Sequence, residues 1–223
     1  MPGIKIEEVS CGERYSGRLW FEMARQLYCE NGREEYREIG HFSDGAPFLY
    51  GDNSRISITH CPGLLAVATL PPTPEVNLEG FTQRAALGID AERRDREQVL
   101  RVRDKYLSAA DRALVPADDL GANVLAWTVK EAVYKAALQP GLDFAEDIRI
   151  VRLPKLGPAT PVFNPADYGL DPSLKAWPAE CYGEVEATLA SGPVLFQIYS
   201  YLSDDFVVTL AFTPKTAKFA KKS

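Results

Sequence analysis

Hydrophobic residues recur at helical spacing in three stretches of the chain. The first stretch covers residues 12–29 and ends before an Asn-Gly pair, which is typical of a helix C-terminus. A second stretch, with Val99, Val102 and Tyr106 on one side, predicts an amphipathic helix. The third covers residues 118–138 and stops before a Pro-Gly pair. Because apolar side chains occupy both of its sides, we expect this last helix to be largely buried.

Alternating and continuous apolar runs predict β-strands in both halves of the chain. Residues 56–61 and 64–70 flank a Pro-Gly pair, and this pattern predicts a β-hairpin. A similar hairpin is predicted near the C-terminus, where residues 195–201 and 206–212 flank a Ser-Asp-Asp turn. Further strands are expected at residues 87–92, 146–152 and 181–189.

The two predicted hairpins, one in each half, suggest a duplicated architecture. Between them, the Pro-Pro-Thr-Pro segment at residues 71–74 has fixed φ angles and lacks backbone donors, so it predicts a connector. We therefore expect an N-terminal half of residues 1–86, a C-terminal half of residues 87–213 and a flexible, lysine-rich tail of residues 214–223. The mixture of helices and antiparallel hairpins indicates the α+β fold class.

Composition argues against several classes of protein. A chain of 223 residues with 46% hydrophobic side chains is long enough to fill a core. Its 31 acidic and 25 basic side chains give a net charge of −6, which argues against a nucleic-acid partner. No run approaches the roughly 18 to 20 apolar residues of a membrane span, and the first residues lack a signal-peptide core. We therefore expect a soluble protein with no membrane partner.

The cysteines and histidines argue against several further kinds of site. The four cysteines include no Cys-x-x-Cys pair, so neither a zinc site nor a dense disulfide framework is indicated, and a reducing cytoplasm is expected. There are two histidines, which excludes a three-histidine metal site and leaves few routes to a Ser-His-Asp triad. The chemistry is therefore expected to depend on carboxylates.

Asp90 and Glu92 lie two residues apart in a predicted strand, so their side chains project from the same face. Carboxylates this close repel each other unless one is protonated or a cation lies between them, and oxygen ligands suit a hard ion such as Mg²⁺. A solvated outer face of an edge strand would give the same spacing. The pair therefore has two interpretations, a metal site or a charged strand surface.

Glu131 lies in the middle of an apolar stripe of the helix predicted at residues 118–138. An unpaired carboxylate in that position would be costly or would lose its charge. Lys135, one turn later, is one candidate partner, because a Glu-to-Lys pair at this spacing is favourable. The alternative is that Glu131 joins Asp90 and Glu92 around one metal ion, which leaves Lys135 to face a phosphate.

Three motifs occur between about residues 45 and 135. Residues 56–61 are Ile-Ser-Ile-Thr-His-Cys, residues 88–92 are Gly-Ile-Asp-Ala-Glu, and residues 127–135 are Trp-Thr-Val-Lys-Glu-Ala-Val-Tyr-Lys. The last two resemble the Gly-Ile-Asp-x-Glu and Trp-x-x-Lys-Glu-Ala-x-x-Lys motifs of the 4′-phosphopantetheinyl transferase superfamily. The first resembles a shorter motif of that family, usually written Ile-Ser-His-Ser. The three motifs also occur in the family's order.

The resemblance implies a Mg²⁺-dependent transfer of the 4′-phosphopantetheine group of coenzyme A to a serine of an apo acyl or peptidyl carrier protein, with release of adenosine 3′,5′-bisphosphate. It also implies the family fold, in which two similar α/β-hairpin subdomains are related by pseudo-twofold symmetry. The length resembles that of the long, surfactin-synthetase-activating type, whose two halves form one chain. A monomer with its site between the halves is therefore expected.

The motif matches indicate which positions of this sequence resemble the family's site residues. Asp90, Glu92 and Glu131 resemble the metal-binding acids. The positions that resemble catalytic residues are Glu131, as base, and Lys135, which resembles the lysine that contacts the coenzyme A phosphates. The positions that resemble further coenzyme A contacts, near its 3′-phosphate, are Thr59 and His60.

Some positions leave alternatives open. Arg25 resembles a nucleotide-binding arginine, although a solvated helix surface with Arg18 and Glu22 would look the same, and Lys130 receives no role. The family's Gly-Lys-Pro motif is Gly-Ala-Pro at residues 45–47, so one expected cation is absent. A second hypothesis is therefore a family-like protein that binds coenzyme A or a carrier protein without catalysis. A third is an unrelated α+β protein in which the Glu-Lys pair is structural.

Overall fold

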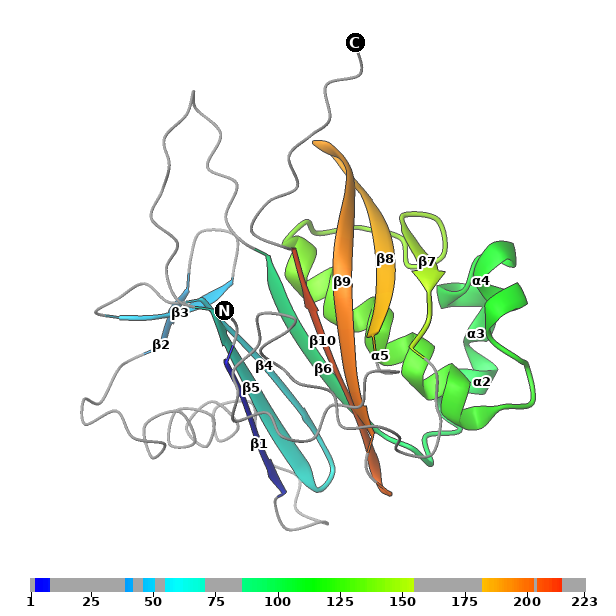
Figure 1. Ribbon diagram of the computed structural model, residues 1–223, viewed down its shortest axis with the longest axis horizontal. Helices are drawn as coiled ribbons and strands as arrows, with labels where there is room; N and C mark the ends of the chain where they lie inside the picture. The colour runs from blue at the N-terminus through cyan, green and yellow to red at the C-terminus, as the bar shows by residue number, and fades with distance from the viewer. Residues whose placement is uncertain are drawn as a thin grey trace.

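The computed structural model describes two antiparallel sheets and a group of helices that covers one of them (Figure 1). The described residues are 3–8, 39–41, 46–50, 55–70, 86–154, 182–202 and 204–213. The helix predicted at residues 12–29, with Arg25, lies outside the described residues, as do the proline-rich connector and the lysine-rich tail. None of the helices that the structure describes is long and apolar enough to cross a bilayer.

The first sheet has the strand order β1-β5-β4-β3-β2. Its strands are β1 (Gly3–Glu8), β2 (Ile39–His41), β3 (Pro47–Leu49), β4 (Arg55–Cys61) and β5 (Leu64–Leu70). The hairpin predicted from residues 56–70 is confirmed: β4 pairs with β5 up to Cys61 and Leu64, and Gly63 takes a φ of 92° in the turn between them. Strand β1, which pairs antiparallel with β5, was not predicted.

The second sheet has the strand order β6-β10-β9-β8-β7. Its strands are β6 (Leu87–Arg93), β7 (Ile148–Arg152), β8 (Tyr182–Leu189), β9 (Gly192–Leu202) and β10 (Phe206–Phe212). Each of these strands was predicted, and so was the β9–β10 hairpin. The α+β expectation thus agrees with the mixture of sheets and helices, while the pseudo-twofold relation between the halves stays a prediction.

The helices lie on the second sheet and are α2 (Gln98–Arg101), α3 (Arg103–Tyr106), α4 (Ala109–Leu114) and α5 (Leu120–Ala137). Helix α5 confirms the long predicted helix to within two residues at its start. The Asp119 side chain caps that start by accepting a hydrogen bond from Ala122 N at 2.9 Å. The amphipathic helix expected around Val99 was wrong as one continuous element, because Val102 leaves the helical conformation, with φ of −107°, and separates α2 from α3.

Strand β6 lies between α5 on one side and β4 and β5 on the other (Figure 1). A Cβ atom on Gly88 would lie 2.0 Å from the carbonyl oxygen of Ala132, so glycine allows β6 to approach α5 this closely. On the opposite side, Leu87, Ile89 and Ala91 pack in one buried cluster with residues of β5 and β10. Asp90, which alternates with them, therefore projects toward α5.

A buried ion pair fixes α5 to its neighbours. Lys130 Nζ and Asp111 Oδ2 are 2.6 Å apart, and both side chains are fully buried. The ammonium also donates to the carbonyl oxygens of Phe144 and Ile148, at 2.6 and 2.5 Å, and Asp111 Oδ1 accepts from Ile150 N at 2.8 Å. Since every charge is paired and hydrogen-bonded, this pair joins α4, α5 and β7 without leaving a buried charge uncompensated.

Lys130→Met is expected to lower the free energy of unfolding by about 3–5 kcal/mol, because it leaves the buried Asp111 carboxylate without its cation. Urea-induced unfolding of the purified protein measures the change. The double variant with Asp111→Asn removes both charges and should recover part of the loss. A Lys130→Met protein as stable as the wild type would contradict this structural role.

Candidate active site

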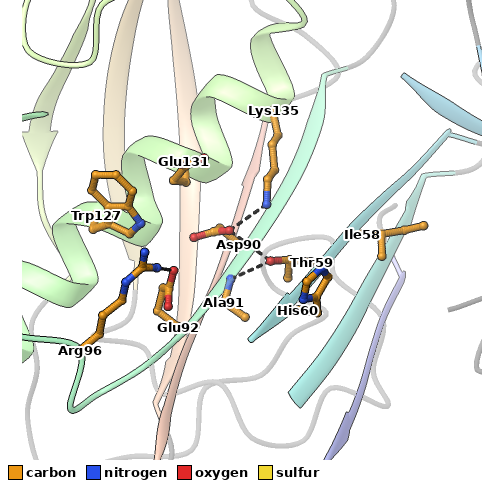
Figure 2. Close-up of a pocket in the computed structure, with 10 residues that line it drawn as sticks. All are labelled: Ile58, Thr59, His60, Asp90, Ala91, Glu92, Arg96, Trp127, Glu131 and Lys135. Atoms are coloured by element: carbon orange, nitrogen blue, oxygen red, sulfur yellow. Dashed lines mark hydrogen bonds and ion pairs between the residues drawn. The ribbon is translucent and has the colours of Figure 1, made fainter. Parts of the chain in front are cut away.

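A cavity of about 250 Å³ opens between β4, β6 and α5 (Figure 2). The motifs singled out in the sequence meet there. Its lining comes from β4, from β6 and the turn after it, and from α5, and consists of Ile58, Thr59, His60, Asp90, Ala91, Glu92, Arg96, Trp127, Glu131 and Lys135. Every predicted site residue that the structure describes therefore lies at one cavity.

Asp90 is the most constrained side chain of the cavity. It is 6% exposed, and its Oδ1 accepts two hydrogen bonds, from Lys135 Nζ at 2.7 Å and from Thr59 Oγ1 at 3.1 Å. Its Oδ2 is buried, and no described residue is its hydrogen-bond partner. A carboxylate oxygen in this state lacks compensation for its lost hydration. The two oxygens of Asp90 are thus unequal: Oδ1 accepts two hydrogen bonds, and Oδ2 is buried with none from the described residues.

Side chains hydrogen-bond to the backbone groups of β6 along the edge that faces β4. Ser57 Oγ accepts a hydrogen bond from Ile89 N at 3.0 Å, and Thr59 Oγ1 accepts one from Ala91 N at 3.2 Å. Lys135 Nζ donates to the carbonyl oxygen of Ile89 at 3.1 Å. Because β6 pairs with β10 on its other edge, these three contacts take the place of a second neighbouring strand.

Glu92 lies at the other end of the cavity and forms an ion pair with Arg96, four residues later. The guanidinium of Arg96 also lies over the ring of Trp127, with 5.6 Å between Cζ and the ring centroid. Sequence reasoning missed Arg96. Its spacing of four residues from Glu92 was a possible signal, but residue 96 follows a strand rather than a helix turn, so the spacing alone did not predict a pair.

Glu131 reaches the cavity from α5. Burial raises the pKa of its carboxyl group, and the nearby Asp90 raises it further, while Lys135 and Arg96 act in the opposite direction. The hypothesis of a Glu131–Lys135 ion pair is not supported, because the ammonium of Lys135 pairs with Asp90 instead. Glu131 therefore lies next to a second acid without an ion pair among the described residues.

His60 lines the open side of the cavity, on β4. Burial lowers the pKa of its imidazole, and the positive charge of Lys135 lowers it further, although Asp90 has the opposite effect. Near neutral pH this favours the uncharged ring, which donates or accepts a hydrogen bond according to its tautomer. Arg25, the remaining candidate for the nucleotide end, lies outside the described residues.

The acids of the cavity fit a hard cation only in part. Within the described ranges, no group of three His, Cys, Asp or Glu side chains is placed to hold one ion. Glu92 is held by Arg96, whereas Asp90 Oδ2 has no partner and Glu131 is desolvated beside it. Oxygen donors of this kind suit Mg²⁺. The chemistry of Asp90 and Glu131 therefore suits a hard cation, while Glu92 is engaged with Arg96.

A second cavity, of about 360 Å³, adjoins the first, since Arg96 and Trp127 line both. Most of its wall is apolar or aromatic. The Trp127 ring lies edge-on to Tyr106, with 5.1 Å between the centroids, and 6.0 Å from the ring of Phe144. The two cavities thus provide a charged compartment and an apolar compartment on either side of Trp127.

Comparison with known proteins agrees with the motifs. Residues 86–187 match the family model described as the 4′-phosphopantetheinyl transferase superfamily. The matched segment contains Asp90, Glu92, Glu131 and Lys135 and supports phosphopantetheinyl transfer as the general activity of this domain. No curated protein matches the chain.

Glu131→Gln is expected to stabilise the protein in the absence of divalent metal at pH about 7. Burial raises the pKa of Glu131 above its unfolded value of about 4.3, so the wild type loses stability as pH rises through the raised folded pKa. Glutamine carries no such charge, and the advantage should disappear below pH about 4.

Urea-induced unfolding in EDTA at both pH values measures the difference. Glu186→Gln is the matched control, since Glu186 is exposed and pairs with Arg149 on the surface. A Glu131→Gln protein that is less stable than the wild type at neutral pH would contradict a desolvated, uncompensated carboxylate.

Proposed function

We propose that this protein transfers the 4′-phosphopantetheine group of coenzyme A to a serine hydroxyl of an apo acyl or peptidyl carrier protein. The reaction depends on Mg²⁺ and releases adenosine 3′,5′-bisphosphate. The protein acts as a monomer of the long, two-halved type in the cytoplasm. The general activity follows from the family match at residues 86–187, and the details are the proposal.

The observation that carries the proposal is the convergence of Asp90 and Glu131 at one cavity. They come from separate motifs, on β6 and α5, and the cavity also receives Thr59 and His60 of the third motif. The unpaired Oδ2 of Asp90 and the raised pKa of Glu131 indicate negative charge that the described residues do not fully neutralise. A structural ion pair would leave no such excess.

The cations of the cavity suit a pyrophosphate. Lys135 is bonded to Asp90, and Arg96 is bonded to Glu92. Transfer at phosphorus depends mainly on positioning and on neutralising the charge of the bridging and equatorial oxygens. We assign Lys135 to the coenzyme A phosphates, because it is held by two acceptors and is therefore oriented in advance.

Glu131 is the proposed base. It lines the cavity from α5, and a carboxylate there can accept the proton of an incoming hydroxyl. The serine oxygen attacks the β-phosphorus of coenzyme A, its proton passes to Glu131 directly or through a water molecule, and the bond from that phosphorus to the bridging oxygen breaks. The bridging oxygen leaves on the α-phosphate as part of adenosine 3′,5′-bisphosphate, so charge and atoms balance.

Asp90 and Glu131 would hold Mg²⁺, with Glu92 as a third ligand once it leaves Arg96. When bound, the ion supplies positive charge for the pyrophosphate. The family resemblance implies Thr59, His60 and Arg25 at the nucleotide end of coenzyme A, and of these His60 and Arg25 are proposed as side-chain contacts. Since Ala46 replaces the family's lysine, this end has one cation fewer.

The apolar cavity beside Trp127 suits the pantetheine arm. The arm is uncharged and is attached to the same pyrophosphate that the charged cavity would hold. Val99, Val102 and Phe144 provide an apolar wall, and the cavity of about 360 Å³ is of the size that binds small ligands. The shared position of Trp127 allows one molecule to occupy both compartments.

The direct test is incubation with coenzyme A, Mg²⁺ and several apo carrier proteins, followed by mass spectrometry of the intact carrier. Transfer should add one phosphopantetheine group to the acceptor serine and release one adenosine 3′,5′-bisphosphate. If no carrier gains mass although calorimetry detects coenzyme A binding, the non-catalytic alternative replaces the proposal.

Glu131→Gln is expected to reduce the transfer rate by at least about 100-fold, because it keeps the shape of the side chain and removes the base. Glu186→Gln, on the exposed face of β8, should transfer at the wild-type rate. Turnover is followed by mass spectrometry under saturating coenzyme A, with circular dichroism as a check on folding. Wild-type turnover in Glu131→Gln would refute the assigned role.

A further inference from the structure

The hydroxyl of Thr59 is already engaged in two protein contacts. The side chain lies on β4 and is 4% exposed. Its Oγ1 accepts a hydrogen bond from Ala91 N at 3.2 Å and donates one to Asp90 Oδ1 at 3.1 Å. A hydroxyl has one proton to donate, and a phosphate oxygen only accepts. While it holds Asp90, Thr59 therefore has no donor left for a coenzyme A phosphate.

Ser57 provides an internal comparison two residues earlier on the same strand. Its Oγ accepts a hydrogen bond from Ile89 N at 3.0 Å, so it completes the β6 edge as Thr59 does. In the described contacts, Ser57 differs from Thr59 in having no bond to a cavity carboxylate. Variants of Ser57 and Thr59 can thus separate the effect of hydrogen bonding to the β6 backbone from the effect of hydrogen bonding to Asp90.

The hydrogen bonds to Asp90 determine which of its two carboxylate oxygens stays without a partner among the described residues. Thr59 and Lys135 both donate to Oδ1, from opposite elements β4 and α5, and Oδ2 has no partner in the part of the chain that the structure describes (Figure 2). Two donors on the same oxygen restrict rotation of the carboxylate group. The branched side chain of threonine also has few χ1 rotamers, so its hydroxyl is held in direction more firmly than that of serine.

We propose that Thr59 is a positioning residue of the active site, whose hydroxyl fixes Asp90 with Oδ2 directed to bind the divalent cation, and that its side chain does not bind coenzyme A. The inference rests on the proposed function, because it assigns Oδ2 of Asp90 to that cation. It places one determinant of metal affinity on the first sheet, although the acids lie on β6 and α5.

Thr59→Val removes the hydroxyl and keeps the shape of the side chain. It should weaken Mn²⁺ binding by roughly 10- to 100-fold, as loss of an outer contact to a metal ligand does. Mn²⁺ is titrated without coenzyme A and followed by electron paramagnetic resonance of the free ion. Thr59→Ser, which keeps the hydroxyl, should retain most of the affinity, and Ser57→Ala should bind Mn²⁺ as the wild type does.

Two further measurements separate positioning from coenzyme A binding. In transfer assays, Thr59→Val should raise the Mg²⁺ concentration for half-maximal rate and leave KM for coenzyme A unchanged. In hydrogen exchange followed by NMR, the Ala91 amide should exchange faster in Thr59→Val, and the Ile89 amide faster in Ser57→Ala. The exchange data confirm folding at the same time.

The possible results distinguish failure of the positioning role of Thr59 from failure of the proposed function. Equal Mn²⁺ affinity in Thr59→Val and wild type, or a raised KM for coenzyme A with an unchanged Mg²⁺ requirement, overturns the positioning role and leaves the proposed function standing. A wild type that binds no Mn²⁺ overturns the positioning role as well. A wild type that binds Mn²⁺ but transfers to no carrier refutes the proposed function, and the affinity of Thr59→Val still decides the role of Thr59.

Discussion

The edge of β6 is the constraint on which the site depends. Among the described strands it pairs with β10, and its other edge is covered by the side chains of Ser57, Thr59 and Lys135. A buried edge must have its N–H and C=O groups paired, and here side chains from β4 and α5 supply the partners. Two of them, Thr59 and Lys135, also hold Asp90. The same contacts that join the two sheets therefore orient the carboxylate of Asp90.

The positive and negative side chains of the cavity nearly cancel, with negative charge in excess. Asp90 and Glu92 each have a cation, Lys135 and Arg96, whereas Glu131 is desolvated and has no ion pair among the described residues. A buried excess of negative charge destabilises the metal-free protein and favours binding of a cation. By contrast, the ammonium of Lys130, one position away on the same helix, is fully compensated by Asp111.

Local sequence patterns predicted the helices and strands, but they did not predict the long-range contacts. The apolar periodicity located α5, and the hairpin signals located β4–β5 and β9–β10, because these features depend on near neighbours in sequence. Asp90, Glu131, Thr59 and His60, which the motifs singled out, line one cavity, and their roles stay predictions. The Lys130–Asp111 pair, the bond from Lys135 to Asp90 and the edge contacts of Ser57 join residues 19 to 45 positions apart, and no periodicity encodes them.

A crystal structure grown with Mn²⁺ and coenzyme A is the most direct measurement of the central claim, since anomalous scattering locates the ion. We predict a peak beside Asp90 Oδ2, with Glu131 as a second ligand and Thr59 still bonded to Oδ1. A peak elsewhere, or an Asp90 that binds the ion through Oδ1 after losing Thr59, would contradict it.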